Sequence, residues 1–333
     1  MKNESRKLKI LTNHGGQLAS PTWRDVTTYL PPNGQDLLSS FKLAWTLYCQ
    51  RSSFDCVVLG GGTSDYLFAL LQTLLPFRTV PCVKIDCLWT KSTNRLRYLF
   101  HRAILRITSK SVDRFIVWAR RDIKAFSETF HIPQEKFLFV PYHTTLDSVN
   151  PTPHSGGYVF SGGNEGRDYE TLLLAVQGLP LKLLIASTSP GLFSHMSIPE
   201  NVEIKGFSHE EYLQKMAECL INIVPLESGG LRTGGHQTYL NSMWLGKPTI
   251  VNDPEGACDY IKHMEDGFLV APKDPKALRA AIEFLLSRRD VMDEMAVRAA
   301  QKAKHYSTEE HFRKIISVVR QILEQKTIND PMD

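Results

Sequence analysis

The sequence predicts an α/β protein made of two Rossmann-like domains with a ligand cleft between them. Its 333 residues are 42% apolar, enough for two domains that each bury their own core. Short apolar runs alternate with helical stretches, which is the pattern of parallel strands covered by helices. The alternation breaks once, at DSVNPTPHSGG (residues 147–157), whose Pro, Ser and Gly content is typical of a linker. We therefore predict an N-terminal domain over residues 1–150 and a C-terminal domain over 151–333.

The first domain is expected to hold five short parallel strands, each a run rich in β-branched and aromatic residues. They are predicted at residues 7–12, 54–59, 79–85, 114–118 and 137–140. Longer stretches between them favour helices, at residues 35–50, 64–75, 92–110 and 121–130. Strands and helices in this order give a parallel sheet whose ligands bind beyond the carboxyl ends of the strands.

The second domain repeats the alternation. Its strands are predicted at residues 158–160, 182–186, 202–204, 221–224 and 249–251. Ser307 and Glu310 have the spacing of a capping box and predict a closing helix over about residues 307–325. Its apolar residues recur at helical spacing: Phe312, Ile315, Ile316, Val319 and Ile322.

Composition narrows the class of protein. The six cysteines have no C-x-x-C pairing, so neither a zinc site nor a disulfide framework is predicted, and a reducing cytosol fits best. The N-terminus, MKNESRKLKILTN, lacks the apolar run of a signal peptide, which disfavours a periplasmic binding protein. No apolar run approaches the roughly 18 residues of a membrane span. We expect a cytoplasmic protein, either soluble or peripheral at the inner face of the membrane.

The two halves of the chain differ in charge. Residues 1–150 hold 20 lysines and arginines against 11 acidic residues, a net charge of +9. Residues 151–333 hold 19 against 24, a net charge of −5. A basic half of this kind indicates an anionic partner, such as a lipid surface or a nucleic acid.

The most informative stretch is TGGHQTYLNSMWLGKPTIVNDPEGACDYIKHMEDGFLVAPKDP, from residue 233. Gly234 and Gly235 precede a helical run, and a helix N-terminus with open N–H donors suits a phosphate. NSMWLGKPTI (residues 241–250) and DGFLV (residues 266–270) resemble the signature of GT-B glycosyltransferases of group 1, the family 4-like superfamily. The resemblance covers nearly the whole chain. It implies two Rossmann-like domains, an acceptor-binding one and then a nucleotide-sugar-binding one, with the closing helix packing back toward the first.

The resemblance also implies a diphosphate site after the strand at 158–160. There Gly162 and Gly163 would let backbone amides approach a pyrophosphate, and Arg167 matches the lysine of the family's pair of cations. The family's earlier arginine is absent. The alternative is an ordinary strand-to-helix turn with a solvated arginine.

The family's paired glutamates, which hold the sugar and the ribose, align with Thr233 and Asn241, so the E-x7-E motif is degenerate. Asn241 could still bond a ribose hydroxyl, because an amide both donates and accepts. Glu227 is an alternative carboxylate in the preceding loop. Further donor contacts are expected from the variant turn Gly235-His236-Gln237-Thr238, and from Phe207 beside the nucleobase. His236 and Phe207 could equally be packing residues.

Asp86 ends the strand predicted at 79–85, where many relatives carry a histidine in an H-D-x-W-like sequence. A carboxylate at a strand end can take a proton from an acceptor hydroxyl, so Asp86 is our candidate base. It could instead cap a helix or pair with Lys84. His14, in a glycine-containing turn after the first strand, is a second candidate. No D-x-D motif occurs, so the sequence predicts neither a metal nor a cofactor, and the nucleotide diphosphate sugar acts as donor substrate.

The segment 91–124 contains ten lysines and arginines and two aspartates. The cations Arg95, Arg102, Arg106 and Lys110 gather on one side of the predicted helix. On another side lie apolar residues: Leu96, Leu99, Phe100, Ala103, Ile104 and Ile107. A basic amphipathic helix indicates docking on anionic lipid. The alternative is that its apolar side packs on the sheet and its arginines are merely solvated.

These observations predict a metal-independent, hexosyltransferase-type glycosyltransferase. It would move a sugar to an acceptor such as a lipid-linked saccharide in polysaccharide or glycolipid synthesis. A GT-B nucleotide-sugar epimerase is the alternative enzyme, although it would need more acidic residues in the cleft. A non-enzymatic binder of anionic surfaces or nucleic acid would explain the basic half. We expect no nucleic-acid partner, because aromatic residues are not interleaved with the arginines as base stacking requires.

Overall fold

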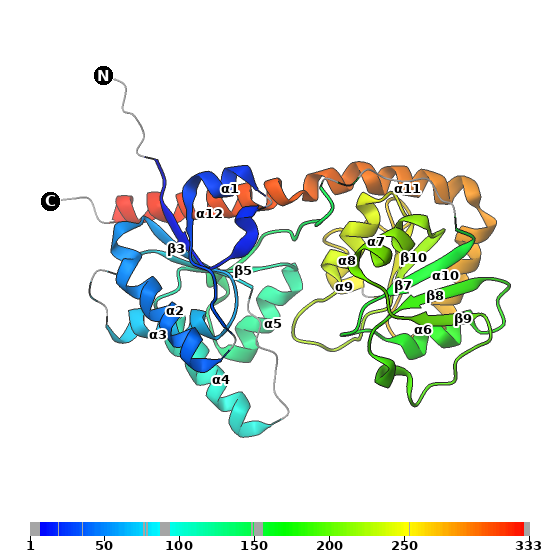
Figure 1. The fold of residues 1–333 in the computed structure, drawn as a ribbon, viewed down its shortest axis with the longest axis horizontal. Helices are drawn as coiled ribbons and strands as arrows, with labels where there is room; N and C mark the ends of the chain where they lie inside the picture. Colours follow the sequence, from blue (N-terminus) through cyan, green and yellow to red (C-terminus); the bar gives the residue numbers. More distant parts are fainter. Residues whose placement is uncertain are drawn as a thin grey trace, which may run out of the picture. The chain divides into compact units, whose positions relative to one another are not determined.

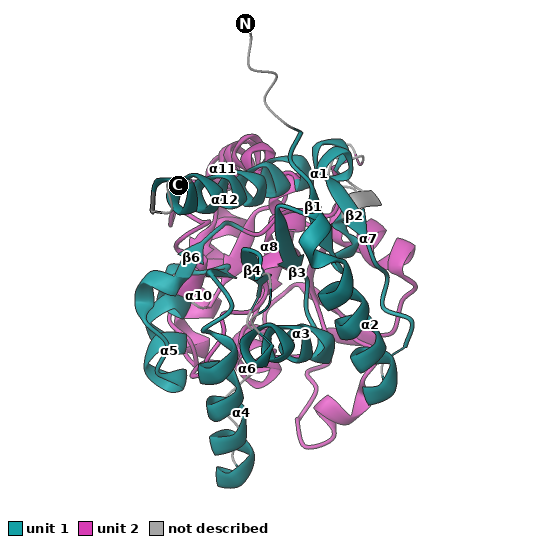
Figure 2. Ribbon diagram, turned by 90° about the vertical axis from the view of Figure 1, so that its left-hand side faces the viewer, with its two compact units in different colours: residues 1–141, 308–333 teal, residues 142–307 magenta. Residues whose placement is uncertain are grey.

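The computed structural model describes residues 7–18, 20–34, 36–75, 77, 79–86, 94–147, 149, 156–252 and 254–329. The chain divides into two compact units: unit 1 is Met1–Pro141 with Thr308–Asp333, and unit 2 is Tyr142–Ser307 (Figure 2). Each unit contains a six-stranded sheet whose neighbouring strands are all parallel. The predicted pair of Rossmann-like α/β domains is therefore confirmed.

The sheet of unit 1 has the strand order β2-β1-β3-β4-β5-β6. Its strands are β1 (Ile10–Thr12), β2 (Thr27–Tyr29), β3 (Cys56–Leu59), β4 (Cys82–Ile85), β5 (Arg114–Val117) and β6 (Phe137–Phe139). The five predicted strands are present, each somewhat shorter than expected. The prediction missed β2, because this edge strand is a partly exposed Thr-Thr-Tyr with no apolar run.

Helices cover both faces of this sheet. They are α1 (Pro21–Val26), α2 (Leu37–Gln50), α3 (Thr63–Leu74), α4 (Arg95–Thr108), α5 (Arg120–Phe130) and α12 (Thr308–Asn329). Figure 1 shows α1 and α12 on one side of the sheet and α2, α3 and α4 on the other. Trp23 of α1 and Phe312 of α12 share one buried cluster with the strand residues of their face, and their rings lie 4.9 Å apart. A Cβ atom on Gly16 would lie only 1.9 Å from the Phe312 ring, so a glycine is needed where α12 packs.

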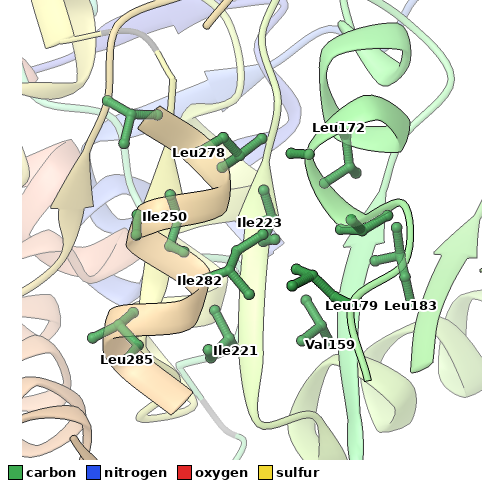
Figure 3. Close-up of a cluster of buried hydrophobic side chains, with 14 of the residues drawn as sticks. Val159, Leu172, Leu179, Leu183, Ile221, Ile223, Ile250, Leu278, Ile282 and Leu285 are labelled. Atoms are coloured by element: carbon green, nitrogen blue, oxygen red, sulfur yellow. The ribbon is translucent and has the colours of Figure 1, made fainter. Parts of the chain in front are cut away.

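The sheet of unit 2 has the order β12-β11-β10-β7-β8-β9. Its strands are β7 (Tyr158–Gly162), β8 (Lys182–Ala186), β9 (Val202–Lys205), β10 (Ile221–Val224), β11 (Thr249–Val251) and β12 (Phe268–Leu269). The helices are α6 (Tyr169–Val176), α7 (His209–Glu218), α8 (His236–Trp244), α9 (Pro254–Ala257), α10 (Pro275–Ser287) and α11 (Arg289–Ala303). Figure 3 shows the apolar core in which Ile221 and Ile223 of β10 face Leu278 and Ile282 of α10.

The units meet in sequence at Pro141 and Tyr142, whereas the linker composition predicted a boundary near residue 150. The difference has a structural cause within unit 2. The side-chain oxygen of Asn241 accepts hydrogen bonds from the Thr144 hydroxyl at 2.8 Å and from the Thr145 amide at 2.9 Å. Leu146 is buried in a core cluster of unit 2. Residues 142–147 therefore belong to the second unit, because specific contacts that composition does not reveal hold them there.

Candidate functional site

The strand order of unit 2 places a topological switch point between β7 and β10. From β7 the chain proceeds to β8 and β9 on one side, and β10 and β11 continue the sheet on the other. Crevices of this kind, at the carboxyl ends of the strands, bind ligands in open α/β sheets. The loop 163–168 after β7 and the loop 225–235 after β10 lie at this point.

Backbone hydrogen bonds join these two loops. The Asp168 amide donates to the Pro225 carbonyl at 2.9 Å, and the Glu227 amide donates to the Gly166 carbonyl at 3.1 Å. Arg167 and Leu226 form an antiparallel β-bridge between these bonds. Two loops 60 residues apart in sequence thus form one surface.

Three glycines at this surface have a structural reason to be glycine. Gly163 has φ +128° and Gly235 has φ +77°, conformations that L side chains rarely adopt. At Gly162 a Cβ atom would lie 2.4 Å from the ring of Tyr212. The glycines predicted from sequence therefore let the backbone approach the Arg167 and Tyr212 side chains closely.

Arg167 lies at the centre of this surface. Its Nε donates to the Gly162 carbonyl at 3.1 Å, and one terminal nitrogen donates to the Glu165 carbonyl at 3.1 Å. The other terminal nitrogen donates to Oγ1 of Thr238 on α8 at 3.0 Å. These three bonds fix the plane of the guanidinium and leave two of its five N–H groups for further partners. The alternative of a solvated arginine in a simple turn is wrong, since the side chain is half-buried and bonded to its own loop and to α8.

Burial sets the electrostatics around Arg167. It lowers the pKa of the guanidinium from its ordinary value, although the neighbouring tyrosines Tyr169 and Tyr212 act in the opposite direction. Burial also raises the pKa of the Tyr212 hydroxyl, while Arg167 and Thr238 partly offset it. An arginine remains protonated at any physiological pH, so this is a partly desolvated positive charge.

Helix α8 begins beside this cation without a side-chain cap. Gly235 occupies its N-cap position, makes no side-chain hydrogen bond there, and the first turn has no acidic residue. Helix α6, by contrast, is capped by Asp168, whose carboxylate accepts from the Thr171 amide at 3.1 Å. The first turn of α8 is therefore the better place for an external anion to accept backbone N–H groups.

A cavity of about 350 Å³ adjoins Gly163 at the carboxyl ends of β7, β8 and β9. Its lining combines Asn164, Ser187 and Thr188 with the rings of Phe207 and Tyr212. The Asn164 side-chain oxygen accepts from the Ser187 hydroxyl at 2.9 Å and from the Thr188 amide at 3.0 Å, which ties two strand-end loops together. The cavity can hold a planar, partly apolar group with polar edges.

The structure brings some of the predicted donor residues together and not others. Gly162, Gly163, Arg167 and Thr238 form one cluster, and Phe207 lines the adjacent cavity. Asn241 uses both atoms of its amide on residues 144 and 145, since its nitrogen also donates to the Thr145 hydroxyl at 3.0 Å.

The remaining predicted residues of the second loop have varied settings. Glu227 and Gln237 are exposed, and Gly234 has open space around it. His236 is buried among aromatic rings, with its centroid 5.3 Å from that of Tyr260 and 5.6 Å from that of Tyr239. Its surroundings indicate a packing role, which the sequence left open.

Sequence reasoning missed Tyr212, Asn164, Ser187 and Thr188. Ser187 and Thr188 directly follow the predicted strand 182–186, so the rule that ligands bind at strand ends could have identified them. Tyr212 lies within α7, and no sequence signal connects it with Gly162.

In unit 1, Asp86 ends strand β4 in an unusual conformation. Its φ of +55° is uncommon for a residue with a side chain, and its backbone amide donates to the Ile116 carbonyl of β5 at 3.0 Å. Asp86 is only 7% exposed. The following described helix, α4, is capped by Asn94 rather than by Asp86. A buried carboxylate held in the left-handed region at a strand end is typical of functional positions.

His14 lies at the switch point of unit 1, between β1 and β3. Its Nδ1 accepts a hydrogen bond from the Gly16 amide at 3.1 Å. This bond fixes the tautomer of the neutral ring, so Nε2 carries the proton and donates. The ring also packs edge-on against Phe312, with centroids 5.4 Å apart. His14 and Asp86 lie at the same edge of the sheet, on strands separated by β3.

A buried polar cluster supports this edge, and the sequence did not indicate it. The Lys84 ammonium donates to Asp65 at 2.8 Å, and both side chains are almost fully buried. Asp65 also accepts from the Asn13 amide at 2.7 Å and from the backbone of Gly61 at 2.7 Å. The cluster fixes the glycine turn 60–62 after β3.

Helix α4 carries three of the predicted basic residues, and Lys110 lies just after its end. Arg95, Arg106 and Lys110 are exposed, and Arg102 is half-buried. The apolar residues expected to face the sheet do not do so. Leu96, Leu99, Phe100 and Ile107 are exposed, whereas Leu105 and Thr108 are the buried residues of the helix. The alternative in which that apolar side packs on the sheet is therefore wrong for these four residues.

The described residues contain neither a metal-binding cluster nor a membrane-spanning helix. No group of three or more His, Cys, Asp and Glu side chains within the described ranges is placed to hold a metal ion. None of the helices seen in the structure is both long enough and apolar enough to span a bilayer.

Comparison with solved structures identifies the fold. The chain is similar to HepE of Anabaena in complex with UDP, with a TM-score of 0.66 and 14% identity over 94% of this chain and 100% of that one. A glycosyltransferase from Rickettsia africae gives a TM-score of 0.66 and 13% identity over 96% and 99%. Sucrose-phosphate synthase from Thermosynechococcus elongatus gives 0.65 and 16% over 90% and 81%. All three comparisons support the GT-B fold of two parallel sheets.

Sequence comparison covers a smaller part of the chain than the structural comparison does. No curated protein matches the chain significantly. The family of glycosyl transferases group 1 matches residues 191–306, which lie within unit 2 and include β10, α8 and β11. Residues 191–306 therefore match the glycosyl transferases group 1 family, within a chain that has the GT-B fold.

Proposed function

We propose that the protein is a glycosyltransferase that binds a nucleotide diphosphate sugar on unit 2. The observation that carries the proposal is the junction of the loops 163–168 and 225–235, where the desolvated Arg167 lies beside the uncapped start of α8. A diphosphate supplies the anionic oxygens that both groups favour. The family match over residues 191–306 supports the same assignment.

The nucleoside occupies the cavity of about 350 Å³ next to Gly163 in this proposal. Phe207 and Tyr212 provide apolar walls for a base, and the Ser187 and Thr188 region provides polar groups for its edge. The HepE structures contain UDP and UDP-glucose, so a uridine nucleotide is the first donor to test.

Unit 1 supplies the acceptor side of the reaction. Asp86 takes the proton of the acceptor hydroxyl as general base, and His14 donates a hydrogen bond through Nε2 to an oxygen of donor or acceptor. Arg167 and the first turn of α8 stabilise the negative charge that develops on the leaving nucleotide diphosphate. These groups describe a transfer without a metal ion or a cofactor.

The acceptor is a sugar, with a lipid-linked saccharide as the leading candidate, which places the enzyme in polysaccharide or glycolipid synthesis. Helix α4 supports this choice, because it carries Arg95, Arg102 and Arg106, and Lys110 follows its end, with no acidic residue between them. Each such cation near an anionic bilayer contributes about 1 kcal/mol to binding. The helix would dock the enzyme at the inner face of the membrane as a peripheral protein.

A thermal-shift screen of nucleotide diphosphate sugars tests the donor assignment. We expect one donor to raise the melting temperature in a concentration-dependent manner, because a ligand of the folded state stabilises it. Incubation of that donor with lipid-extract acceptors, followed by mass spectrometry, then tests transfer. Conversion of the donor sugar to its epimer without any acceptor would instead identify an epimerase. If no nucleotide diphosphate or sugar conjugate stabilises the protein, the proposal is overturned.

A further inference from the structure

The outer layer of unit 1 exposes far more apolar surface than helix α4 alone. On α2 the exposed side chains fall on one side of the helix: Leu37, Leu38, Phe41 and Trp45. Leu37 is 69% exposed and Trp45 is 46% exposed. The opposite side of α2 is buried through Leu43, Ala44 and Leu47. The helix is thus apolar toward the core and also toward the outside.

Helix α3 also has apolar residues on both its core side and its outer side. Phe68, Ala69 and Gln72 are buried against the domain. On the opposite side Leu67, Leu70 and Leu71 are half-buried, and Leu74 is 65% exposed. A helix in the outer layer of an α/β domain normally presents polar residues to water. The exposed Leu74, with three half-buried leucines on the same side of α3, is an exception to this pattern.

These residues form one surface with those of α4. Helix α3 packs against α2 on one side and against α4 on the other, and Figure 1 shows the three helices together on one side of unit 1. Leu96, Leu99 and Phe100 continue the apolar surface onto the first half of α4. We call this combined surface of α2, α3 and α4 the apolar layer. Exposed apolar side chains that gather on neighbouring helices indicate an interaction site, whereas singly scattered ones do not.

The charges within and around the apolar layer indicate which partner covers it. Among the described residues of this region, the cations that reach the surface are Lys42, Arg95, Arg97, Arg102, Arg106 and Lys110, against the acidic residues Asp36, at the cap of α2, and Asp55. The cations Arg51 and Lys84 are buried. Asp65 and Asp86 are buried. The layer therefore combines leucines and aromatic rings with a basic margin, which suits the interfacial region of an anionic bilayer. A second copy of unit 1 would bring like charges together.

We propose that the apolar layer inserts into the interfacial region of an anionic membrane, with α2 and α3 entering beside α4. The inference rests on the proposed docking of α4 and adds an apolar component to it. Charge attraction weakens as salt rises, whereas burial of apolar side chains does not. Membrane binding therefore has a salt-sensitive part, carried by the cations of α4, and a salt-resistant part, carried by the apolar layer.

Flotation with vesicles of phosphatidylglycerol and phosphatidylcholine separates the two parts. The double variant Leu38→Ser with Phe41→Ser should lose about tenfold or more of the partition coefficient at high salt, since two large side chains no longer leave water. Replacing Arg95, Arg102, Arg106 and Lys110 with Gln should reduce binding mainly at low salt. Leu174→Ser with Val297→Ser is the matched control, because both residues are exposed and belong to unit 2. This control should float like the native protein.

Trp45 provides an independent reporter of insertion. Brominated acyl chains should quench the fluorescence of the native protein more strongly than that of Trp45→Phe, which keeps an apolar ring but removes the probe. Equal quenching in both proteins would exclude insertion of α2. Failure of the native protein to float, or equal flotation of the native protein and the Leu38→Ser, Phe41→Ser variant at high salt, would also overturn the proposal.

Sedimentation velocity without lipid tests the competing occupant. A native dimer that becomes a monomer in the α2 variant would show that a second copy covers the layer, and would overturn the membrane proposal. Donor binding by calorimetry should be unchanged in every variant of the layer, since none of these residues belongs to unit 2. Failure of the membrane inference is thus distinguishable from failure of the proposed donor site.

Discussion

The two units have the same kind of sheet, but the helices that begin at their switch points, α3 and α8, differ in their first turns. At the switch point of unit 1, α3 begins with Asp65 in its first turn, and this carboxylate already accepts the Gly61 amide and pairs with Lys84. Both α3 and α8 begin at a glycine without a side-chain cap, but the first turn of α8, at the switch point of unit 2, has no acidic residue. Unit 1 thus contains a built-in anion where unit 2 leaves N–H donors for a ligand. The comparison shows that topology marks both crevices, while the side chains decide which one suits an external phosphate.

The two units also differ in net charge and in the apolar surface that they expose. Unit 1 contains 24 lysines and arginines and 15 acidic residues, a net charge of +9, and it carries the apolar layer. Unit 2 contains 15 and 20, a net charge of −5. Within this acidic unit, Arg167 is a local exception at the switch point. We interpret the contrast as a division of roles, with acceptor chemistry and membrane docking in unit 1 and donor binding in unit 2.

The largest expected effect comes from replacing the proposed base of unit 1, Asp86, with an amide of the same size. Asp86→Asn should lower turnover by about two to four orders of magnitude, because a general base typically accelerates a reaction by about this factor. Donor affinity in calorimetry should stay near that of the native protein. Turnover close to native would confine Asp86 to a structural role, and a loss of donor affinity would contradict the division between the units.

Phe312→Ala should separate the stabilities of the two units. Loss of a fully buried aromatic side chain costs about 3–5 kcal/mol. The ring packs against Trp23 and Gly16, so the cost should fall on unit 1. Hydrogen exchange should show faster opening of β1 and β3 with little change in β7 and β10. Val297→Ala, on an exposed position of α11, is the control. Equal loss of protection in both units would mean that they unfold as one.

Arg167→Ala tests unit 2 directly. Removing a charge-assisted contact should weaken binding of the nucleotide diphosphate by about 1.5–3 kcal/mol, measured by calorimetry. Arg298→Ala removes an exposed arginine of the same unit, which pairs with Glu294 on the surface, and should leave the affinity unchanged. The same loss in both variants would indicate general electrostatics, and no loss in Arg167→Ala would remove this residue from the donor site.

The smallest effect concerns pH and the docking of α12. Burial alone would raise the pKa of Glu309, but hydrogen bonds from the Ser20 and Thr22 hydroxyls outweigh it and lower the pKa from its ordinary value of 4.5. A carboxylate with a lowered folded pKa stabilises the fold above its unfolded pKa, and this contribution is lost as pH falls through the folded value. Glu309→Gln should therefore cost about 1 kcal/mol at neutral pH.

Chemical denaturation of Glu309→Gln and the native protein across the acid range provides the measurement. The difference in unfolding free energy should shrink as pH falls below 4.5. Glu310→Gln is the neighbouring control, since this residue pairs with the exposed Arg313 on the surface. A difference that does not depend on pH would show that the charge of Glu309 does not matter.

Much of the fold could be predicted because the buried strands are short apolar runs with clear ends. The residues 182–186 and 221–224 are strands in the structure with the predicted bounds. Strands β2 and β12 escaped prediction, because each has only two half-buried residues, no fully buried one, and depends on its partner strand. Helix α1 also escaped, because the Ser20 cap begins a helix of only six residues, Pro21–Val26.

The site residues could be predicted where a glycine-rich turn follows a strand. They could not be predicted where tertiary packing brings distant residues together. Gly162, Gly163 and Arg167 were found from a turn after a strand. Tyr212 was not, because its contact with Gly162 joins positions 50 residues apart. The amide of Asn241 matched a ligand-binding position of the family by alignment, yet in this chain it holds residues 144 and 145. Alignment gives the position of a residue but not its hydrogen-bond partners.

The placement of α12 has a consequence for biosynthesis. Unit 2 is one continuous segment, whereas unit 1 needs residues 308–333, which the ribosome makes only after all of unit 2. Until then the apolar cluster formed by Val83 of the first sheet and Trp23 of α1 lacks α12, the helix that covers it. Unit 2 can therefore complete its core first, although its sequence comes second, and the nascent first unit must wait with an open apolar face. Chaperones that bind such faces have their longest opportunity during translation of residues 142–307.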